Sequence, residues 1–369
     1  MTAAADHPPP TAPVSSPDTR PALTVIMPAY NAGRYLIPAI ESVLSQTWRD
    51  FEFIIIDDGS TDGTRERIED YALRDARIRD YPNAKNIGVT RSLNRAISLA
   101  RADWIARMDA DDISLPTRFE KQMAVVRADP SIGLVTSPFD VIDAQQRRIP
   151  GWRGIRFQQE MLPFFLLFYN RLNAHGQVLY STSLVRSLGG YREKYHLSEA
   201  TELWLRMVRA TRWAVVPEPL YLWRADNPHS VSRQHAFRYA DASLLACREE
   251  IARACNIDVS KEEMIALRDF WLRCENKDRN WDDVENLLLR IAARFHPPHP
   301  VPHWRRKLAI ALGCAWFAQT IQHAKRHRTR EALRDLGRGL HAAGGYLPLA
   351  LAQFVRETFA VKAQLSRRA

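Results

Sequence analysis

The first 110 residues alternate apolar runs with amphipathic segments, and no other feature of the chain constrains the fold as much. The apolar runs are residues 22–30, 51–60 (ending in an Asp-Gly-Ser turn), 77–82 and 104–109, and the segments with helical spacing between them are residues 34–47, 60–72 and 89–97. Runs of this kind predict buried strands, and the helical spacing predicts helices packed on them. The alternation predicts an α/β fold with a mostly parallel sheet covered on both faces.

Acidic residues follow two of the predicted strands. Asp57 and Asp58 end the second strand, and Asp109, Asp111 and Asp112 end the fourth. Ligands of open parallel sheets bind outside the carboxyl ends of the strands, so we expect the two acidic ends to meet at one rim. Neighbouring carboxylates repel each other unless a cation or a hydrogen-bonding ligand offsets the repulsion, and Asp-x-Asp suits Mg²⁺, which takes one or two carboxylates and substrate phosphates. The alternative is that these acids cap a segment or lie in solvated turns.

Three linked blocks of the sequence resemble family 2 glycosyltransferases. The blocks are residues 25–64, 86–112 and 115–122. This resemblance implies a GT-A fold and inverting sugar transfer from a nucleoside diphosphate donor, usually a UDP-sugar, to a hydroxyl of a glycan or glycolipid in cell-surface polysaccharide biosynthesis. The resemblance implies a nucleotide-sugar-binding half (22–125) and an acceptor-binding half (126–240). Composition predicts a disordered Pro-rich leader (1–21), and helical spacing outside the resemblance predicts a basic helical extension (241–369) that the Pro-rich stretch 296–304 interrupts.

The resemblance assigns the donor site residue by residue. The implied donor-binding residues are Pro28, Tyr30, Asp58, Asn86, Arg91, Asp109 and Asp111. Tyr30 would lie against the nucleobase and Asp58 would accept its hydrogen bonds, whereas Asp57 would cap the turn. Asp109 would lie near the ribose and the metal, and Asp111 would bind Mg²⁺ or Mn²⁺ at the diphosphate. For Asn86, Gly88, Arg91 and Asn94, a role in loop and helix architecture is an equal alternative.

The chain departs from the family at the catalytic base. The relatives carry an Asp four residues before the Trp of a Glu-Asp-x-x-Leu-Trp segment, and Ala200 occupies that position in "SEATELWLRM". Because alanine takes no proton, three alternatives stay open. Glu199 supplies the base from a shifted loop, Glu202 reaches in instead of being a solvated helical acid, or the chain is a donor-binding pseudoenzyme or scaffold in a glycan-assembly complex. We predict Glu199 as the base.

The acceptor and diphosphate side depends on weaker similarity. His175, Arg224 and His229 stand at positions that the resemblance places near the acceptor, the diphosphate or the metal. A structural hydrogen bond for the histidine, and a surface loop for the other two, are the alternatives. Residues 159–170 are apolar almost throughout, which indicates either core or a lip that faces lipid.

The positive charge of the chain is concentrated in its tail. The formal net charge is +10, and from Val301 onward thirteen Lys and Arg stand against three acids. The tail also carries the apolar residues Trp304, Trp316, Phe317, Leu349, Phe354 and Phe359. This combination suits a helix on an anionic membrane surface, and a basic helical cap packed on the catalytic domain is the equal alternative. No nucleic-acid recognition motif accompanies the basic residues, so we predict no nucleic-acid partner.

The cysteine content and the apolar stretches of the sequence indicate in which cellular compartment the protein is found. The four cysteines are too few and too far apart for a disulfide scaffold or a metal knuckle, which indicates a reducing cytosolic compartment. The N-terminus has no signal-peptide pattern, and the most apolar late stretch, which starts at Leu308, is too short to span a bilayer as a helix. We therefore predict a cytoplasmic protein, peripheral on the inner face of the cell membrane if the tail binds lipid.

Overall fold

A computed structural model describes residues 20–153, 159–170, 172, 174–225, 227, 236–272, 280–325, 329–346 and 350. Its central element is a seven-stranded sheet with the strand order β10-β6-β9-β4-β1-β2-β3. The strands are β1 (Leu23–Ala29), β2 (Phe51–Asp57), β3 (Ile78–Pro82), β4 (Trp104–Arg107), β6 (Ile132–Thr136), β9 (Leu179–Ser181) and β10 (Arg212–Val215). The neighbours β3, β2, β1 and β4 are parallel, and β9 runs antiparallel to β4 and β6. The predicted mostly parallel α/β sheet is confirmed.

Helices cover both faces of this sheet. They are α1 (Leu36–Leu44), α2 (Thr64–Arg74), α3 (Val89–Leu99) and α4 (Arg118–Ala128), with the 3₁₀ turn η1 (Gly33–Tyr35) before α1. Successive residues of a strand point to opposite faces. In β1, Val25 and Met27 accordingly pack with Ile40 of α1, whereas Ile26 packs on the other face with Leu93 of α3. The near-continuous apolar runs of the sequence are thus buried from two sides.

A second, four-stranded sheet closes over the end of β4. It has the order β5-β11-β7-β8, formed by β5 (Ile113–Ser114), β11 (Tyr221–Arg224), β7 (Phe139–Ile142) and β8 (Arg148–Arg153). β5 begins directly after the acidic cluster of residues 109–112 and pairs antiparallel with β11. This pairing brings residues near 224 to the acidic cluster, although more than a hundred residues separate them in the sequence.

Helices and 3₁₀ turns lie between β8 and β10 in the sequence. They are η2 (Gln159–Met161), α5 (Leu162–Leu166), η3 (His175–Gln177), α6 (Thr182–Ser187), η4 (Glu193–Tyr195) and α7 (Glu199–Ala210). The apolar segment at α5 is core: Phe164 and Phe168 are fully buried, and Phe164 packs edge-on to Trp304 of the C-terminal extension. The interpretation of this segment as a lip that faces lipid is wrong, because helices of the extension cover it.

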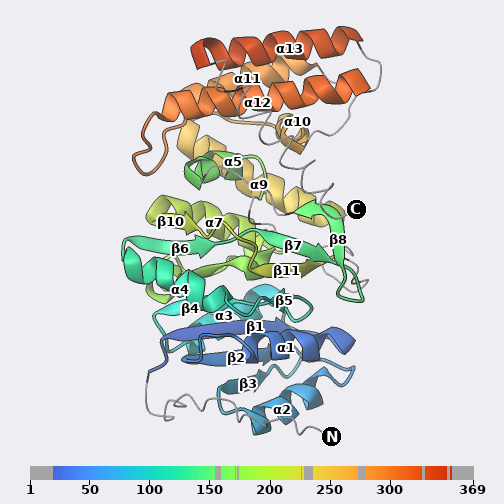
Figure 1. The fold of residues 1–369 in the computed structure, drawn as a ribbon, viewed down its shortest axis with the longest axis vertical. Coiled ribbons are helices and arrows are strands. Elements are labelled where there is room, and N and C mark those ends of the chain that lie inside the picture. Colours follow the sequence, from blue (N-terminus) through green and yellow to red (C-terminus); the bar gives the residue numbers. More distant parts are fainter. Residues whose placement is uncertain are drawn as a thin grey trace, which may run out of the picture.

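The chain continues as a helical extension, as predicted. Its elements are α9 (Ala236–Cys255), α10 (Lys261–Leu272), α11 (Trp281–Arg294), α12 (Trp304–Lys325), α13 (Thr329–Ala343) and η5 (Gly344–Tyr346). Figure 1 shows α12 and α13 side by side at one end of the long axis, and α2 and β3 at the other end. The Pro-rich stretch between α11 and α12 forms the predicted break.

The apolar residues that suggested a membrane-bound tail are mostly inside the extension. Trp316 and Phe317 are 2% and 3% exposed, and Trp304 packs against the cluster that contains Trp316. For these three residues the packed-cap alternative is correct. Leu349, Phe354 and Phe359 lie outside the described residues. In the part of the chain that the structure describes, no helix is long and apolar enough to cross a membrane.

Candidate functional site

The two acidic strand ends share one edge of the sheet but not one cluster. Strand β1 lies between β2 and β4, so the two strands are not neighbours. Asp58 accepts hydrogen bonds from the backbone N–H groups of Ile87 and Gly88, both at 2.9 Å, and from Asn83 Nδ2 at 2.7 Å. It thus holds the loop between β3 and α3. The expected common rim is confirmed, because β2, β1 and β4 are parallel, and at that rim Asp58 is bound by its own loop.

Asp57 is the turn residue that the resemblance implied. It is 2% exposed, and its carboxylate accepts from the backbone N–H of Ser60 at 3.4 Å. A carboxylate in this position stabilises the Asp-Gly-Ser turn after β2. That turn keeps Asp58 at the start of the loop it organises.

The acids after β4 form the charged centre of the site. Arg107, which is 3% exposed, makes an ion pair with Asp109. Asp111 accepts a hydrogen bond from Asn227 Nδ2 at 2.7 Å, and Asp112 accepts one from the backbone N–H of Arg224 at 2.8 Å. Each acid therefore has a different partner: Arg107 of β4, Asn227, and Arg224 of β11.

Two of the carboxyl groups at this centre are buried beside one another. Burial, reinforced by the charge of Asp109, raises the pKa of Asp111 to about 6. Burial and both neighbouring carboxylates raise the pKa of Asp112 well above its usual range. A divalent cation at Asp109 and Asp111 would relieve this repulsion, and two carboxylates with substrate phosphates are a usual ligand set for Mg²⁺. Among the described residues no group of three or more His, Cys, Asp or Glu side chains is arranged to hold a metal by itself.

Glu199 lies at the N-terminus of α7 beside this centre. It is 7% exposed, and its Oε2 atom has no hydrogen-bond partner among the described residues. Burial raises the pKa of Glu199, and the charges of Arg107 and Asp109 act on the same carboxyl group in opposite directions. Ala200 is 8% exposed and packs in the apolar cluster of the α7 face. The Glu199 carboxyl group therefore has one oxygen without a partner near the Asp-x-Asp loop, as Asp112 has in its Oδ2 atom, and it stands one residue before the family position.

Glu202 is neither free nor solvated. It is 5% exposed and binds Arg206 through two hydrogen bonds, from Nε at 2.7 Å and from Nη2 at 2.6 Å. Arg192 Nη1 donates a third, at 3.0 Å. The alternative that Glu202 is a solvated helical acid is wrong, because the helix buries this face against the turn that contains Leu188.

His175 and Arg224 serve the architecture of the site. The His175 Nε2 atom hydrogen-bonds with the Tyr191 hydroxyl at 2.8 Å, and burial together with the charge of Arg107 holds the pKa of His175 well below its usual range. Arg224 is 1% exposed and donates to the backbone oxygens of Asp111 and Asp143, both at 2.7 Å. It clamps the acidic loop to β11. His229 lies outside the described residues.

The expected donor residues divide into exposed and structural groups. Tyr30 is 50% exposed after β1, and Pro28 pairs with Ile56 within the sheet. Asn86 is exposed and accepts from the backbone N–H of Gly88 at 3.0 Å. Arg91 makes a surface ion pair with Glu193 at 2.7 Å. The architectural alternative has direct support for Asn86.

Asn94 joins α3 to the segment around Tyr191. Its Nδ2 donates to the Tyr191 backbone oxygen and its Oδ1 accepts from the Tyr191 backbone N–H, both at 2.8 Å. Gly190 lies against it, since a Cβ at that position would come 2.5 Å from the Asn94 Oδ1 atom. Asn94 is therefore an architectural residue.

Sequence reasoning missed Arg107 and Asn227. A signal for Arg107 was present, because a lone arginine in the otherwise apolar strand "WIARMD" requires a buried partner. Asn227 carried no comparable signal. Its contact with Asp111 depends on the pairing of β5 with β11, which the sequence does not reveal.

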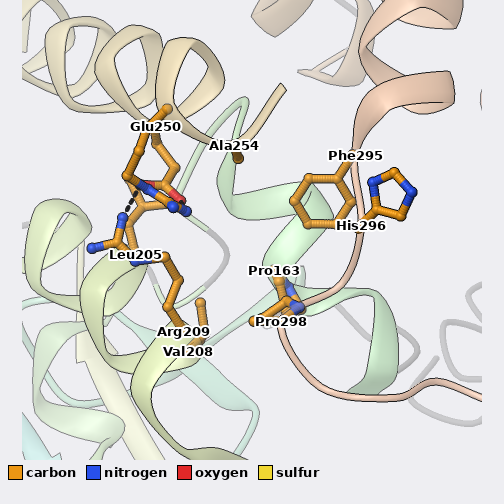
Figure 2. Close-up of a pocket in the computed structure, with 10 residues that line it drawn as sticks. Pro163, Leu205, Val208, Arg209, Glu250, Ala254, Phe295, His296 and Pro298 are labelled. Carbon is orange, nitrogen blue, oxygen red and sulfur yellow. Dashed lines mark hydrogen bonds and ion pairs between the residues drawn. The ribbon is translucent and has the colours of Figure 1, made fainter. Parts of the chain in front are cut away.

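A separate cavity of about 380 Å³ lies at the junction with the extension. Figure 2 shows it between α7, α9 and the segment after α11, with Phe295 and His296 on one side. Glu250 on its wall makes ion pairs with Arg209 and Arg253, both at 2.5 Å. Arg209 lies at the opposite end of α7 from Glu199, so this cavity is distinct from the acidic centre.

The chain is similar in sequence to known glycosyltransferases. The family model described as glycosyl transferase family 2 matches residues 24–189. A protein named as a glycosyltransferase, EpsE of Bacillus subtilis, is 34% identical over 234 residues, which cover 62% of this chain and 82% of EpsE. The O-antigen biosynthesis glycosyltransferase WbnJ of Escherichia coli is 29% identical over 238 residues, which cover 62% of this chain and 88% of WbnJ.

Solved structures share the fold. S. aureus TarS 1–349 in complex with UDP-GlcNAc superposes with a TM-score of 0.50 at 15% identity, over 85% of this chain and 90% of the TarS fragment. At this identity the likeness shows a common GT-A architecture and no more. The predicted fold type is confirmed.

Proposed function

The chain belongs to glycosyl transferase family 2 and is a glycosyltransferase, and we propose that it transfers a sugar from a UDP-sugar to a hydroxyl of a glycan or lipid-linked glycan. The reaction inverts the anomeric carbon, is assisted by a divalent metal and serves cell-surface polysaccharide biosynthesis in the cytoplasm. We further propose that residues 22–125 bind the donor and residues 126–240 bind the acceptor. Two relatives carry names that fit this role, an O-antigen biosynthesis glycosyltransferase and a chondroitin synthase.

The observation that carries the proposal is the carboxyl group of Glu199. It is nearly buried, its Oε2 atom has no partner among the described residues, and it lies within electrostatic reach of Arg107 and Asp109. A buried carboxyl group with a raised pKa and a specific charged neighbour is a candidate acid or base of a catalytic site. Structural carboxylates nearby, such as Glu202, have their oxygens bound.

Glu199 acts as the general base in the proposed reaction. The acceptor hydroxyl oxygen forms a bond to the anomeric carbon as the bond from that carbon to the diphosphate oxygen breaks. The electron pair of the broken bond leaves with UDP, and the hydroxyl proton passes to Glu199. A carboxylate whose pKa is raised by burial is a stronger base near neutral pH than one in water.

Asp109 and Asp111 hold the metal in this proposal. Burial, reinforced by the charge of Asp109, raises the pKa of Asp111, and a cation bound there would stabilise both carboxylates. When bound there, Mg²⁺ or Mn²⁺ supplies positive charge to the departing diphosphate. Arg107 holds Asp109 from the inner side through its ion pair, and Asn227 holds Asp111.

Tyr30 is proposed to stack on the nucleobase. It is half exposed at the carboxyl end of β1, where an aromatic face can receive a planar base without displacing core residues. Pro28 shapes the strand beneath it. Asp58 is proposed to act through the loop that it holds at Ile87 and Gly88, and Arg91 lies on the helix that follows that loop.

Three variants test the base assignment. Glu199→Gln, Ala200→Asp and the exposed control Glu66→Gln are compared for UDP release from a panel of UDP-sugars with Mn²⁺, and for UDP binding by calorimetry. We expect Glu199→Gln to lose about 10² to 10⁴ in turnover with UDP binding unchanged, because loss of a positioned base has an effect of this size. Full turnover in Glu199→Gln would refute the assignment.

The absence of an acid at position 200 favours one second candidate, a donor-binding pseudoenzyme or scaffold of a glycan-assembly complex. Its distinguishing result is UDP binding by the native chain without turnover, together with turnover in Ala200→Asp alone. If the native chain and Glu66→Gln turn over equally and Glu199→Gln does not, this candidate is excluded.

A further inference from the structure

One face of α13 exposes three leucines. Leu333, Leu336 and Leu340 are 63%, 37% and 41% exposed, and residues three, four and seven positions apart share one side of a helix. Tyr346, which follows the helix, is 41% exposed. Half of the large apolar side chains that are exposed in the described part of the chain lie between residues 333 and 346. A concentration of this kind marks an interaction surface.

Packing on the opposite face keeps these leucines outward. Gly339 lies so close to α12 that a Cβ atom there would come 2.5 Å from the ring of Phe317. Arg338, at 6% exposure, makes an ion pair with Glu285 of α11 at 3.1 Å, and its guanidinium lies 4.9 Å from the ring centre of Trp316. A rotation that buried the leucines would break these buried contacts. The exposure of the leucines is therefore a property of the packed extension.

The charged side chains described as exposed on α12 and α13 are basic. Arg305 and Arg306 at the start of α12 and Arg334 on α13 are exposed, and the Arg306 guanidinium lies 5.8 Å from the ring centre of Tyr346. Asp335 is 2% exposed. Of the side chains described in these two helices, none that reaches solvent is acidic.

We infer that the leucine face of α13 docks on the surface of an anionic lipid bilayer. The leucines enter the boundary between headgroups and acyl chains, and the arginines contact anionic headgroups. A bilayer offers both an apolar layer and negative charge, which matches the two properties of this face. From Val301 onward the sequence has thirteen Lys and Arg against three acids, so the tail as a whole is positively charged, as this face is. The inference goes beyond the proposed function and does not depend on Glu199.

The position of α13 allows this docking without covering the donor half. Figure 1 shows α13 at the end of the long axis opposite to α2 and β3. A bilayer at α13 therefore leaves the strands that carry Tyr30 and Asp58 away from the lipid. Leu73 on α2 is 90% exposed and provides a matched control at the far end of the molecule.

The test is co-sedimentation of the full chain with vesicles. Vesicles of phosphatidylcholine with roughly a quarter phosphatidylglycerol are compared with pure phosphatidylcholine, at low and high salt. We expect wild type and Leu73→Ser to bind the anionic vesicles, and Leu333→Ser/Leu336→Ser/Leu340→Ser to bind at least tenfold more weakly. Binding should weaken with salt, since the arginine contribution is screened. Melting temperatures of all three proteins should agree, because the substituted side chains are exposed.

Four results would overturn the inference. The first is that the triple variant binds vesicles as tightly as wild type, and the second is that wild type binds neither kind of vesicle. The third is that light scattering finds a dimer for wild type and a monomer for the triple variant, which assigns the face to a second copy of the chain. The fourth is that the single variant Leu333→Ser melts several degrees lower than Leu73→Ser, which assigns the leucines to packing within the chain.

Discussion

Replacing Glu202 by glutamine separates structure from catalysis on α7. Glu202 and Arg206 are 5% and 4% exposed and share two short hydrogen bonds, and Arg192 contributes a third. Removing one partner of a buried ion pair costs about 3–5 kcal/mol. Arg206 keeps its hydrogen bonds to the backbone oxygens of Leu188 and Gly190, at 2.6 and 2.7 Å, and glutamine keeps one acceptor oxygen. We therefore expect a loss of about 2–3 kcal/mol, near the value of hydrogen bonds to charged groups.

The assay combines thermal unfolding with turnover. Glu202→Gln should melt several degrees below wild type, and its UDP-release rate at a temperature where both proteins are folded should stay within a few-fold of wild type. In a double-mutant cycle, Glu202→Gln/Arg206→Met should destabilise less than the sum of the two single variants, because the two residues interact directly. A wild-type melting temperature combined with a hundredfold loss of turnover would refute this reasoning and make Glu202 the catalytic base.

Three further predictions address the donor pocket, the extension and the pH dependence of stability. Tyr30→Ala should weaken UDP binding roughly tenfold in calorimetry without changing the melting temperature, since base stacking contributes about 1–3 kcal/mol and the side chain is half exposed; unchanged affinity would count against a stacking role. Arg338→Met should destabilise the extension by about 3–5 kcal/mol in denaturant unfolding, because it removes the guanidinium that binds buried Asp335 at 2.9 Å, and an unchanged transition would contradict the importance of that pair. The pKa of His175 in the folded state lies below 6.5. Below pH 6.5 the unfolded state therefore binds more protons, and the free energy of unfolding falls as the pH is lowered, by up to about 1.4 kcal/mol per pH unit. His175→Gln should lose less stability than wild type between pH 7 and pH 5 in urea unfolding, and equal losses would show that His175 does not titrate as proposed.

Much of the fold of the first 110 residues could be predicted from local pattern. The strands β1 to β4 and the helices between them follow from apolar runs and helical spacing, since a parallel strand buried on both faces needs an apolar side chain at nearly every position. The acids at the ends of β2 and β4 were found for the same reason, because charge directly after such a run marks the place where the strand leaves the core. The predicted helices of the extension and the break between α11 and α12 also followed from spacing and proline content.

The partners of those acids were decided by tertiary structure alone. The sequence placed Asp58 and Asp109 at one rim of the sheet, but only the structure shows that β1 lies between their strands and that the loop after β3 binds Asp58. The contact of Asp111 with Asn227 requires two segments more than a hundred residues apart to pair as β5 and β11. Hydrogen bonds of this kind depend on distances between segments, which no periodicity within one segment encodes.

The amino-acid sequence by itself determined the α/β class, the order of the elements in the first half and the chemistry available at the strand ends, because local propensity and burial pattern are properties of short stretches. Only the tertiary structure decided that Glu202 is bound to Arg206 while Glu199 has an unsatisfied oxygen. It also decided that α13 buries Arg338 and leaves Leu333 outside. Both outcomes depend on which face of a helix meets its neighbours, and that orientation is set by contacts with residues distant in the chain.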